Sequence, residues 1–315
     1  MPSYWQLLLL ILPVFALIGL GLGARRVGWL TEEADSSLLK LVVNLLYPCL
    51  ILENVLGNEA LRDPSNVVLA PLAAFVTISL GIFGALYFGR LVGLESGRGL
   101  RTFAYSTGIY NYGYIPIPLT IALFDREVLG VLLVFNVGCE AAIWTVGILL
   151  LSGGTLKEGW RRLINAPLVA LIVGLVGNAF NLDAHLPAAA RTVISMCGAC
   201  AIPLGLLLIG ATLMEYLGRP AQLFSAKITT AACLLRLAVF PAAFLTLAWI
   251  LPASPELKRV MVVEAAMPSG ILSIVIVKHF GGQPLTAVQV VLGTTLVGLL
   301  AIPLLLQVGL HWVAP

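Results

Sequence analysis

The sequence predicts an all-α membrane protein whose ten transmembrane helices form two inverted five-helix repeats. Hydrophobic residues make up 60% of the 315 positions and charged residues only 10%, whereas soluble domains average about 25% charged residues. Since one span needs about 20 apolar residues, the chain has room for about ten spans and short loops. Prolines at matching places in the two halves indicate a duplication.

Ten apolar segments are expected to cross the bilayer. The first is expected to be a retained helix, because no basic residue precedes it and no small-residue cleavage site is evident. The five cysteines all fall within such segments, where cysteine most often serves as a small packing residue. The ten segments are residues 4–24, 37–56, 67–89, 101–124, 128–151, 165–182, 191–216, 225–250, 257–279 and 285–311.

Basic residues in the loops predict the orientation. With the amino terminus outside, the inner loops carry eleven Lys and Arg residues and the outer loops five. The positive-inside rule therefore places both termini outside, in a multi-pass protein of the cell (inner) membrane. The net charge of +3 reflects this orientation, and no nucleic-acid partner is expected. The inner residues are Arg25, Arg26, Arg90, Arg98, Arg101, Lys157, Arg161, Arg162, Arg219, Lys227 and Lys278.

The longest inner connection, residues 152–164, separates a first repeat at 1–151 from a second at 165–315. Each half contains an odd number of predicted spans, so the second half enters the membrane with the opposite orientation. Inverted repeats of this kind are typical of secondary transporters.

Prolines mark equivalent places in the two halves. Pro48 in the second segment and Pro203 in the seventh are 155 residues apart, and Pro116 in the fourth and Pro268 in the ninth are 152 residues apart. The fourth and ninth segments are expected to be broken helices, because proline lacks an amide donor and disfavours a helical conformation in the residue before it. A kink stabilised by neighbouring helices is the alternative, and it fits a single proline better than the fourth segment.

Two half-helices that begin at these breaks predict a substrate site near the midplane of the membrane. A helix N-terminus carries about half a positive charge and unpaired amides, so a carboxylate is the natural ligand. Asn44 is a weaker candidate, for which a helix-to-helix hydrogen bond is the alternative. The predicted substrate-binding residues are Asn44, Asn111, Gly113, Pro116, Pro118, Met267, Pro268 and Ser269.

Three charged residues, Glu140, Arg236 and Glu264, lie deep within predicted spans. A charge at the centre of a bilayer costs about 2.5 to 3.5 kcal/mol on insertion scales, so each needs a partner or a role. One hypothesis is that the carboxylates bind sodium or a proton, and the alternative is a structural pair between Arg236 and one glutamate. The other predicted ion-coupling residues are Asn136, Thr294 and Thr295, with the Asn111 oxygen as a further ligand.

No metal is firmly assigned by the sequence, and no cofactor is expected beyond a coupling ion. The chain contains no H-E-x-x-H, P-loop or G-x-S-x-G motif, which are signatures of common enzyme classes. An enzyme is therefore disfavoured.

Several motifs resemble the auxin efflux carrier family, and the resemblance covers essentially the whole chain. The family includes bacterial permeases for malate and related acids and the plant PIN-formed auxin exporters. Pro116 departs from the family, in which a small residue is common at this place. The motifs are Gly28-Trp-Leu-Thr-Glu-Glu33 leading to Pro48, Asn111-Tyr-Gly113-Tyr-Ile-Pro-Ile-Pro118-Leu, Ile202-Pro203 through Leu213, Ala266-Met267-Pro268, and Thr294-Thr295 through Pro303-Leu.

The resemblance implies a fold similar to that of bile acid sodium symporters. Spans one, two, six and seven would form a scaffold, and spans three to five and eight to ten a moving transport unit whose fourth and ninth helices cross at their prolines. It also implies transport of a small organic anion, malate-like or auxin-like, by alternating access. Sodium or protons are candidate coupling ions, and a homodimer is one candidate assembly.

Two other functions fit the sequence. One is a sodium or proton antiporter of related fold, in which the glutamates carry the ion and there is no organic substrate. The other is a membrane receptor that binds a ligand without completing a transport cycle.

Overall fold

The computed structural model describes residues 2–95, 97–152, 162–217 and 223–313. Within these ranges the chain is helical, and its extended pairing is a single isolated bridge between two helix breaks. This confirms the prediction of an all-α protein. Residues 153–161 of the predicted connection at 152–164, and the last two residues of the predicted outer terminus, lie outside the described part.

Seven described helices are long and apolar enough to cross a membrane. Three of them contain a π-helical turn between two α-helical parts. They are α1 (Tyr4–Arg26); α2 (Glu32–Leu41) with Val42–Leu46 and α3 (Tyr47–Val55); α4 (Pro64–Leu91); α7 (Arg126–Ala142) with Ile143–Gly147 and α8 (Ile148–Ser152); α11 (Ala188–Leu217); α12 (Ala226–Leu234) with Leu235–Val239 and α13 (Phe240–Ile250); and α16 (Pro284–Trp312).

The remaining apolar segments form shorter helices, so the count of ten spans stays a prediction. The fourth predicted segment is divided into two short helices, and so is the ninth, while the sixth is one helix of 14 residues. These are α5 (Arg98–Gly108) and α6 (Pro116–Leu123), α14 (Pro255–Ala265) and α15 (Leu272–His279), and α10 (Ala166–Ala179). Short 3-10 turns lie at Ala60–Arg62 and Leu182–His185.

Local sequence explains where several helices begin. Side chains of Asp125, Asn165 and Ser254 accept hydrogen bonds from backbone amides in the first turns of α7, α10 and α14, which satisfies donors that have no partner within the helix. Helix α2 begins at Glu32, five residues earlier than predicted. Its first turn contains three acidic residues, which the positive end of the helix dipole stabilises although they are not apolar.

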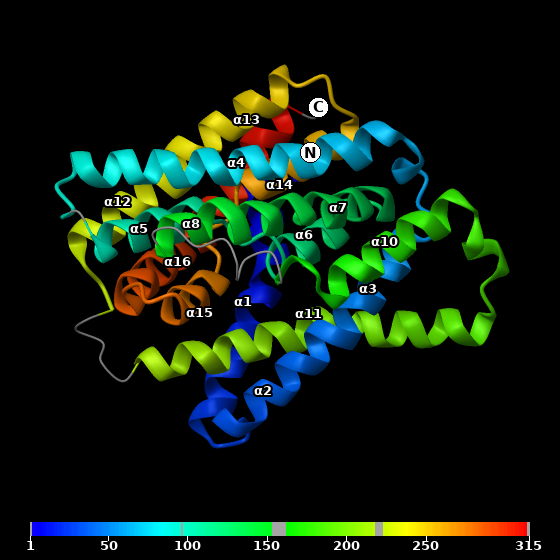
Figure 1. Ribbon diagram of the computed structural model, residues 1–315, viewed down its shortest axis with the longest axis horizontal. Helices are drawn as coiled ribbons and strands as arrows, with labels where there is room; N and C mark the ends of the chain where they lie inside the picture. Colours follow the sequence, from blue (N-terminus) through cyan, green and yellow to red (C-terminus); the bar gives the residue numbers. More distant parts are fainter. Residues whose placement is uncertain (1, 96, 153–161, 218–222, 314–315) are drawn as a thin grey trace.

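The helices pack in two groups (Figure 1). In one group α11 packs against α1 and α3, and α3 packs against α10. In the other, α4 packs against α5 and α7, α13 against α14, and α16 against α5 and α12. The groups meet where α1 contacts α16 and where α3 contacts α7. The division of the chain into a scaffold and a transport unit stays a prediction.

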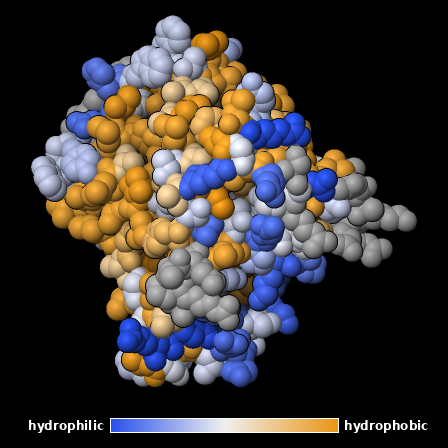
Figure 2. Space-filling model, turned by 90° about the vertical axis from the view of Figure 1, so that its left-hand side faces the viewer, coloured by the Kyte–Doolittle hydropathy of each residue, from blue (hydrophilic) through white to orange (hydrophobic). Residues whose placement is uncertain are grey.

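The surface combines polar ends with apolar flanks. Figure 2 looks onto the left-hand end of the molecule in Figure 1, where α4 ends and α5, α12 and α16 begin. Strongly hydrophilic residues gather in the central and lower part of this face. Hydrophobic residues cover the flank beside them. Leu9, Phe83 and Leu300 are among the large apolar side chains that are more than half exposed. A bilayer covers such a surface, which in water would be prone to association.

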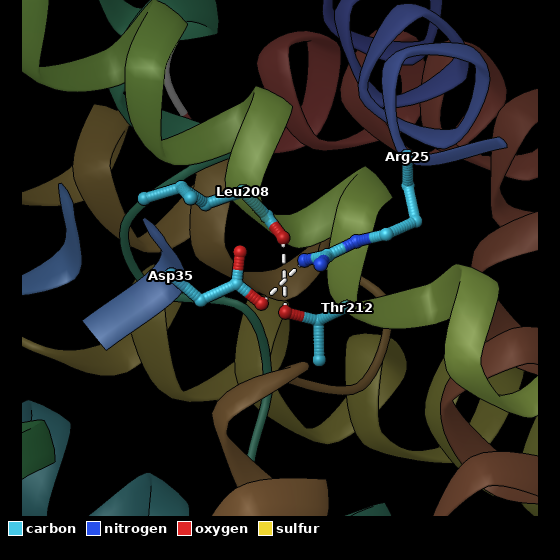
Figure 3. Close-up of polar contacts among 4 residues, drawn as sticks. All are labelled: Arg25, Asp35, Leu208 and Thr212. Atoms are coloured by element: carbon cyan, nitrogen blue, oxygen red, sulfur yellow. Dashed lines mark hydrogen bonds and ion pairs between the residues drawn. The ribbon is translucent and has the colours of Figure 1, made fainter. Parts of the chain in front are cut away.

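An ion pair fixes the turn between α1 and α2. Arg25 at the end of α1 pairs with Asp35 of α2, and this is the one ion pair found between described residues. Next to it, the Thr212 hydroxyl of α11 donates to the Leu208 carbonyl oxygen at 2.9 Å (Figure 3). The pair therefore joins the two helices of the first hairpin, beside α11.

Helices α1 and α11 approach closely because each has a glycine at their contact. A Cβ atom added to Gly21 would lie 2.8 Å from the carbonyl carbon of Leu207, and one added to Gly210 would meet the backbone of Ile18 and Leu22. Small residues that let backbones approach are the usual means of helix association in membranes.

We expect Gly21→Ala to lower the stability of the protein by about 1 to 3 kcal/mol, the usual cost of overpacking. Gly19→Ala is the matched control on the same helix, because a Cβ atom there meets nothing within 4 Å. It should leave the melting temperature unchanged or raise it slightly, since alanine favours helix more than glycine does. Thermal unfolding in detergent measures both, and equal melting temperatures would contradict the packing role of Gly21.

Candidate functional site

The two helix breaks cross each other and pair through their backbones. Tyr110, after the end of α5, and Ser269, after the end of α14, form an antiparallel bridge. The Asn111 amide donates to the Pro268 carbonyl oxygen at 2.8 Å, and the Gly270 amide donates to the Ile109 carbonyl oxygen at 2.9 Å. Each break thus satisfies backbone groups of the other in an apolar interior, as a break within a membrane requires. We call residues 109–115 and 266–271 the crossover.

Predicted site residues occupy defined places at the crossover. Pro116 is the first residue of α6. The Asn111 Oδ1 accepts from the Ile115 amide at 3.3 Å, which caps the approach to α6. The Ser269 amide donates to the Thr294 hydroxyl at 3.1 Å, and that hydroxyl donates to the Val290 carbonyl oxygen at 2.8 Å. The structure therefore brings Asn111, Pro116, Ser269 and Thr294 together, along with Pro118, Met267 and Pro268 of the same segments.

One side of the crossover is less buried than the rest. Tyr112, Gly113 and Tyr114 are half-buried, and we call them the open edge. Their three backbone amides have no hydrogen-bond partner within the described ranges. A Cβ atom added to Gly113 would lie 3.8 Å from the Tyr47 hydroxyl of α3, and the Tyr114 ring lies against Gly205 of α11. The open edge therefore faces the helix group that contains α3 and α11.

Arg236 binds the crossover through backbone carbonyls. Its Nε donates to the Met267 carbonyl oxygen at 2.9 Å and its Nη2 to the Ala265 carbonyl oxygen at 3.4 Å. Its guanidinium carbon lies 5.0 Å from the centre of the Tyr110 ring, a cation–π distance. Arg236 is 2% exposed, and it makes no ion pair with a described glutamate. The guanidinium therefore binds backbone carbonyls directly, and it interacts electrostatically with Glu264 without forming an ion pair among the described residues.

The two deep glutamates have different surroundings. Both oxygens of Glu140 accept hydrogen bonds, from the Tyr112 hydroxyl at 2.5 Å and from the Trp144 Nε1 at 2.6 Å. Glu264 is fully buried, and neither of its carboxylate oxygens has a hydrogen-bond partner among the described residues. A buried carboxylate without hydrogen-bond donors is costly, and Arg236 is a buried charged group that interacts with it electrostatically.

The remaining predicted residues are more scattered. Asn44 is exposed and donates to the Lys40 carbonyl oxygen of its own helix at 2.9 Å, so it makes no helix-to-helix bond. Neither amide atom of Asn136 makes a hydrogen bond of good geometry, although the Tyr47 hydroxyl lies beside it. The buried Thr295 hydroxyl also has no described partner. The oxygens of Asn111, Glu140 and Thr294 take part in separate hydrogen bonds rather than in one ligand cluster.

Tyrosines of the site were not among the predicted residues. Tyr112 and Tyr114 belong to the open edge, and the Tyr110 hydroxyl contacts the Thr77 hydroxyl at 3.1 Å. Their spacing at every second position around the first break, in Tyr-Asn-Tyr-Gly-Tyr, was the available signal. It is the repeat expected of an extended chain rather than of a helix.

Paired broken helices inside an apolar helical bundle are typical of integral membrane proteins of the transporter class. A family model described as membrane transport protein matches residues 7–159 and again 154–306. A curated relative from Methanothermobacter thermautotrophicus, described as an uncharacterized transporter, is 30% identical over 274 residues, which are 84% of this chain and 86% of the relative. The chain belongs to this membrane transport family, the auxin efflux carrier family that its motifs predicted.

We expect Arg236→Met to destabilise the protein by about 2 to 5 kcal/mol, because the carbonyls of Ala265 and Met267 would lose their donor in a buried place. The control is Arg62→Met, which removes an exposed hydrogen bond to the Asn181 side chain and should change stability little. Melting temperatures in detergent measure the difference. A similar value for the two variants would show that Arg236 does not hold the crossover.

Proposed function

We propose that the protein transports a small organic anion by alternating access, with a malate-like or auxin-like carboxylate bound at the open edge. The observation that carries the proposal is the set of three consecutive unpaired amides at Tyr112, Gly113 and Tyr114. Successive backbone amides in a turn form an anion-binding concavity, and residues 113–115 form a bend and turn directly before α6. The start of α6 adds the positive end of a helix dipole.

The side chain of Asn111 completes this donor set. Its Oδ1 is engaged by the Ile115 amide, whereas its Nδ2 has no hydrogen-bond partner among the described residues. Pro116 and Pro118 remove two N–H groups from the first turn of α6, so the carboxylate donors are the open-edge amides and the Asn111 Nδ2. Pro268, Met267 and Ser269 support the site by holding the first break in place.

The proposed topology has ten crossings, with α5–α6 as the fourth and α14–α15 as the ninth. The second five crossings are inverted, and both termini lie outside the cell membrane. The scaffold contains α1, α2–α3, α10 and α11, and the transport unit contains α4–α8 and α12–α16. The position of the open edge between these two groups supports a substrate site that opens to one side or the other as the groups move.

Glu264 is proposed as the coupling residue. Its lack of hydrogen-bond donors is the observation that favours a proton or a sodium ion at this carboxylate, with buried oxygens of Ser269 or Thr295 as additional ligands for sodium. The same observation favours a second candidate function, a cation antiporter without an organic substrate.

The first test is counterflow of radiolabelled malate and indole-3-acetate in proteoliposomes, with Asn111→Asp compared with wild type. The aspartate keeps the oxygen that accepts from the Ile115 amide but loses the Nδ2 donor and adds negative charge. Binding of a carboxylate should weaken about tenfold to a hundredfold, with nearly unchanged thermal stability. Asn44→Asp, on a helix whose asparagine bonds only within that helix, should have a smaller effect. Unchanged affinity in Asn111→Asp would remove Asn111 from the site.

The second test concerns Glu264→Gln. If the carboxylate exchanges a proton or sodium during the cycle, the amide should abolish the sodium or pH dependence of transport while the protein still folds. Glu256→Gln is the control, because Glu256 lies in the first turn of the same helix α14 and outside the crossover. A cation antiporter would show ion flux and no carboxylate counterflow. Wild-type ion dependence in Glu264→Gln would mean that coupling lies elsewhere.

A further inference from the structure

Of the two deep carboxylates, Glu140 is the one held at both oxygens. The donors come from different parts of the chain, the Tyr112 hydroxyl from the open edge and the Trp144 indole from the π-helical turn one turn after Glu140. Hydrogen bonds to an ionised acceptor are short and strong, and two of them fix the orientation of the carboxylate and spread its charge. Each Glu140 oxygen is therefore already engaged by a donor, whereas neither oxygen of Glu264 is engaged by a described residue.

Trp144 is held in turn from its ring face. The Arg162 guanidinium carbon lies 5.3 Å from the centre of the Trp144 ring and 6.0 Å from that of Phe280. The Arg162 Nη2 also lies 3.1 Å from the His279 Nε2. A cation over an indole face is attracted to it. A continuous row of contacts thus runs from Arg162, just before α10, through Trp144 and Glu140 to Tyr112.

The bond to Glu140 restrains the Tyr112 side chain. Tyr112 is the first residue of the open edge, whose three amides are the proposed carboxylate donors. Rotation about its Cα–Cβ bond would move the ring relative to these amides, and the hydrogen bond from its hydroxyl prevents that rotation. Anchoring the ring at its hydroxyl also restrains the backbone that carries it, so the donor amides are held closer to one arrangement and less entropy is lost on binding.

We infer that Glu140 is a positioning residue for the substrate, which acts through the Tyr112 hydroxyl and does not bind the coupling ion. This inference rests on the proposed function, because it takes the open edge as the substrate site. It divides the two carboxylates by role: Glu264 responds to ions, and Glu140 fixes the geometry of the anion site.

The test compares Tyr112→Phe, Glu140→Ala and the double variant in the full-length protein. Loss of either end of this hydrogen bond should raise KM for counterflow of malate or indole-3-acetate about tenfold, the effect of one hydrogen bond to a charged group, with little change in maximal rate. The double variant should be no worse than the worse single variant, because both remove the same interaction. Glu140→Gln keeps an acceptor for Trp144 and a partner for the Tyr112 hydroxyl, so KM and ion dependence should stay near wild type.

Tyr114→Phe is the matched control. Tyr114 lies on the same open edge, but its hydroxyl makes no hydrogen bond to Glu140 in the described ranges, so its effect should add to that of Glu140→Ala. Melting temperatures of the same variants without substrate report the bond between Tyr112 and Glu140 independently of transport.

Two outcomes would overturn the inference. Additive shifts in melting temperature and KM for Tyr112→Phe and Glu140→Ala would show that the two side chains do not act together. Loss of sodium or pH dependence in Glu140→Gln would make Glu140 an ion-coupling residue. A third outcome is the absence of counterflow with both malate and indole-3-acetate, together with non-additive shifts in melting temperature. It would refute the proposed function and leave the bond between Glu140 and Tyr112 established.

Discussion

The pairing of backbone groups within the crossover is the constraint on which the rest of the structure depends. A polypeptide cannot leave amides and carbonyls unpaired in hydrocarbon, yet prolines prevent a continuous helix in the fourth segment. The structure resolves this conflict by pairing residues 109–111 with residues 268–270. Neither break could exist without the other, so the two halves of the chain have to meet at this point.

Other polar groups are arranged around this pairing. Arg236 binds the carbonyls that end α14, and Thr294 binds the amide of Ser269. Among the crossover amides without a partner in the described ranges, those of the open edge lie on its less buried side. The proposed binding capacity is on this side, whereas Arg236 and Thr294 hold the backbone elsewhere.

The sequence predicted what depends on local chemistry. Proline and glycine placed both breaks correctly, and low charge predicted the helical membrane fold. The roles of the charged residues could not be predicted, because their partners lie far away in the sequence: Arg236 binds Ala265 and Met267, and Glu140 binds Tyr112. Asn44 was predicted as a weaker substrate-binding candidate, but its side chain bonds within its own helix. The charged first turn of α2 was also missed, because a prediction based on hydrophobicity starts this span five residues too late.

The two half-helices at the crossover are chemically unequal. Helix α6 has proline at its first and third positions, whereas α15 begins Leu272-Ser273-Ile274 and keeps all of its N–H groups. In a carrier whose inverted halves exchange conformations, identical halves would give inward-facing and outward-facing forms of equal free energy. The prolines break that symmetry. In the proposed alternating-access cycle, the inward-facing and outward-facing forms are therefore expected to differ in free energy and in their affinity for the substrate.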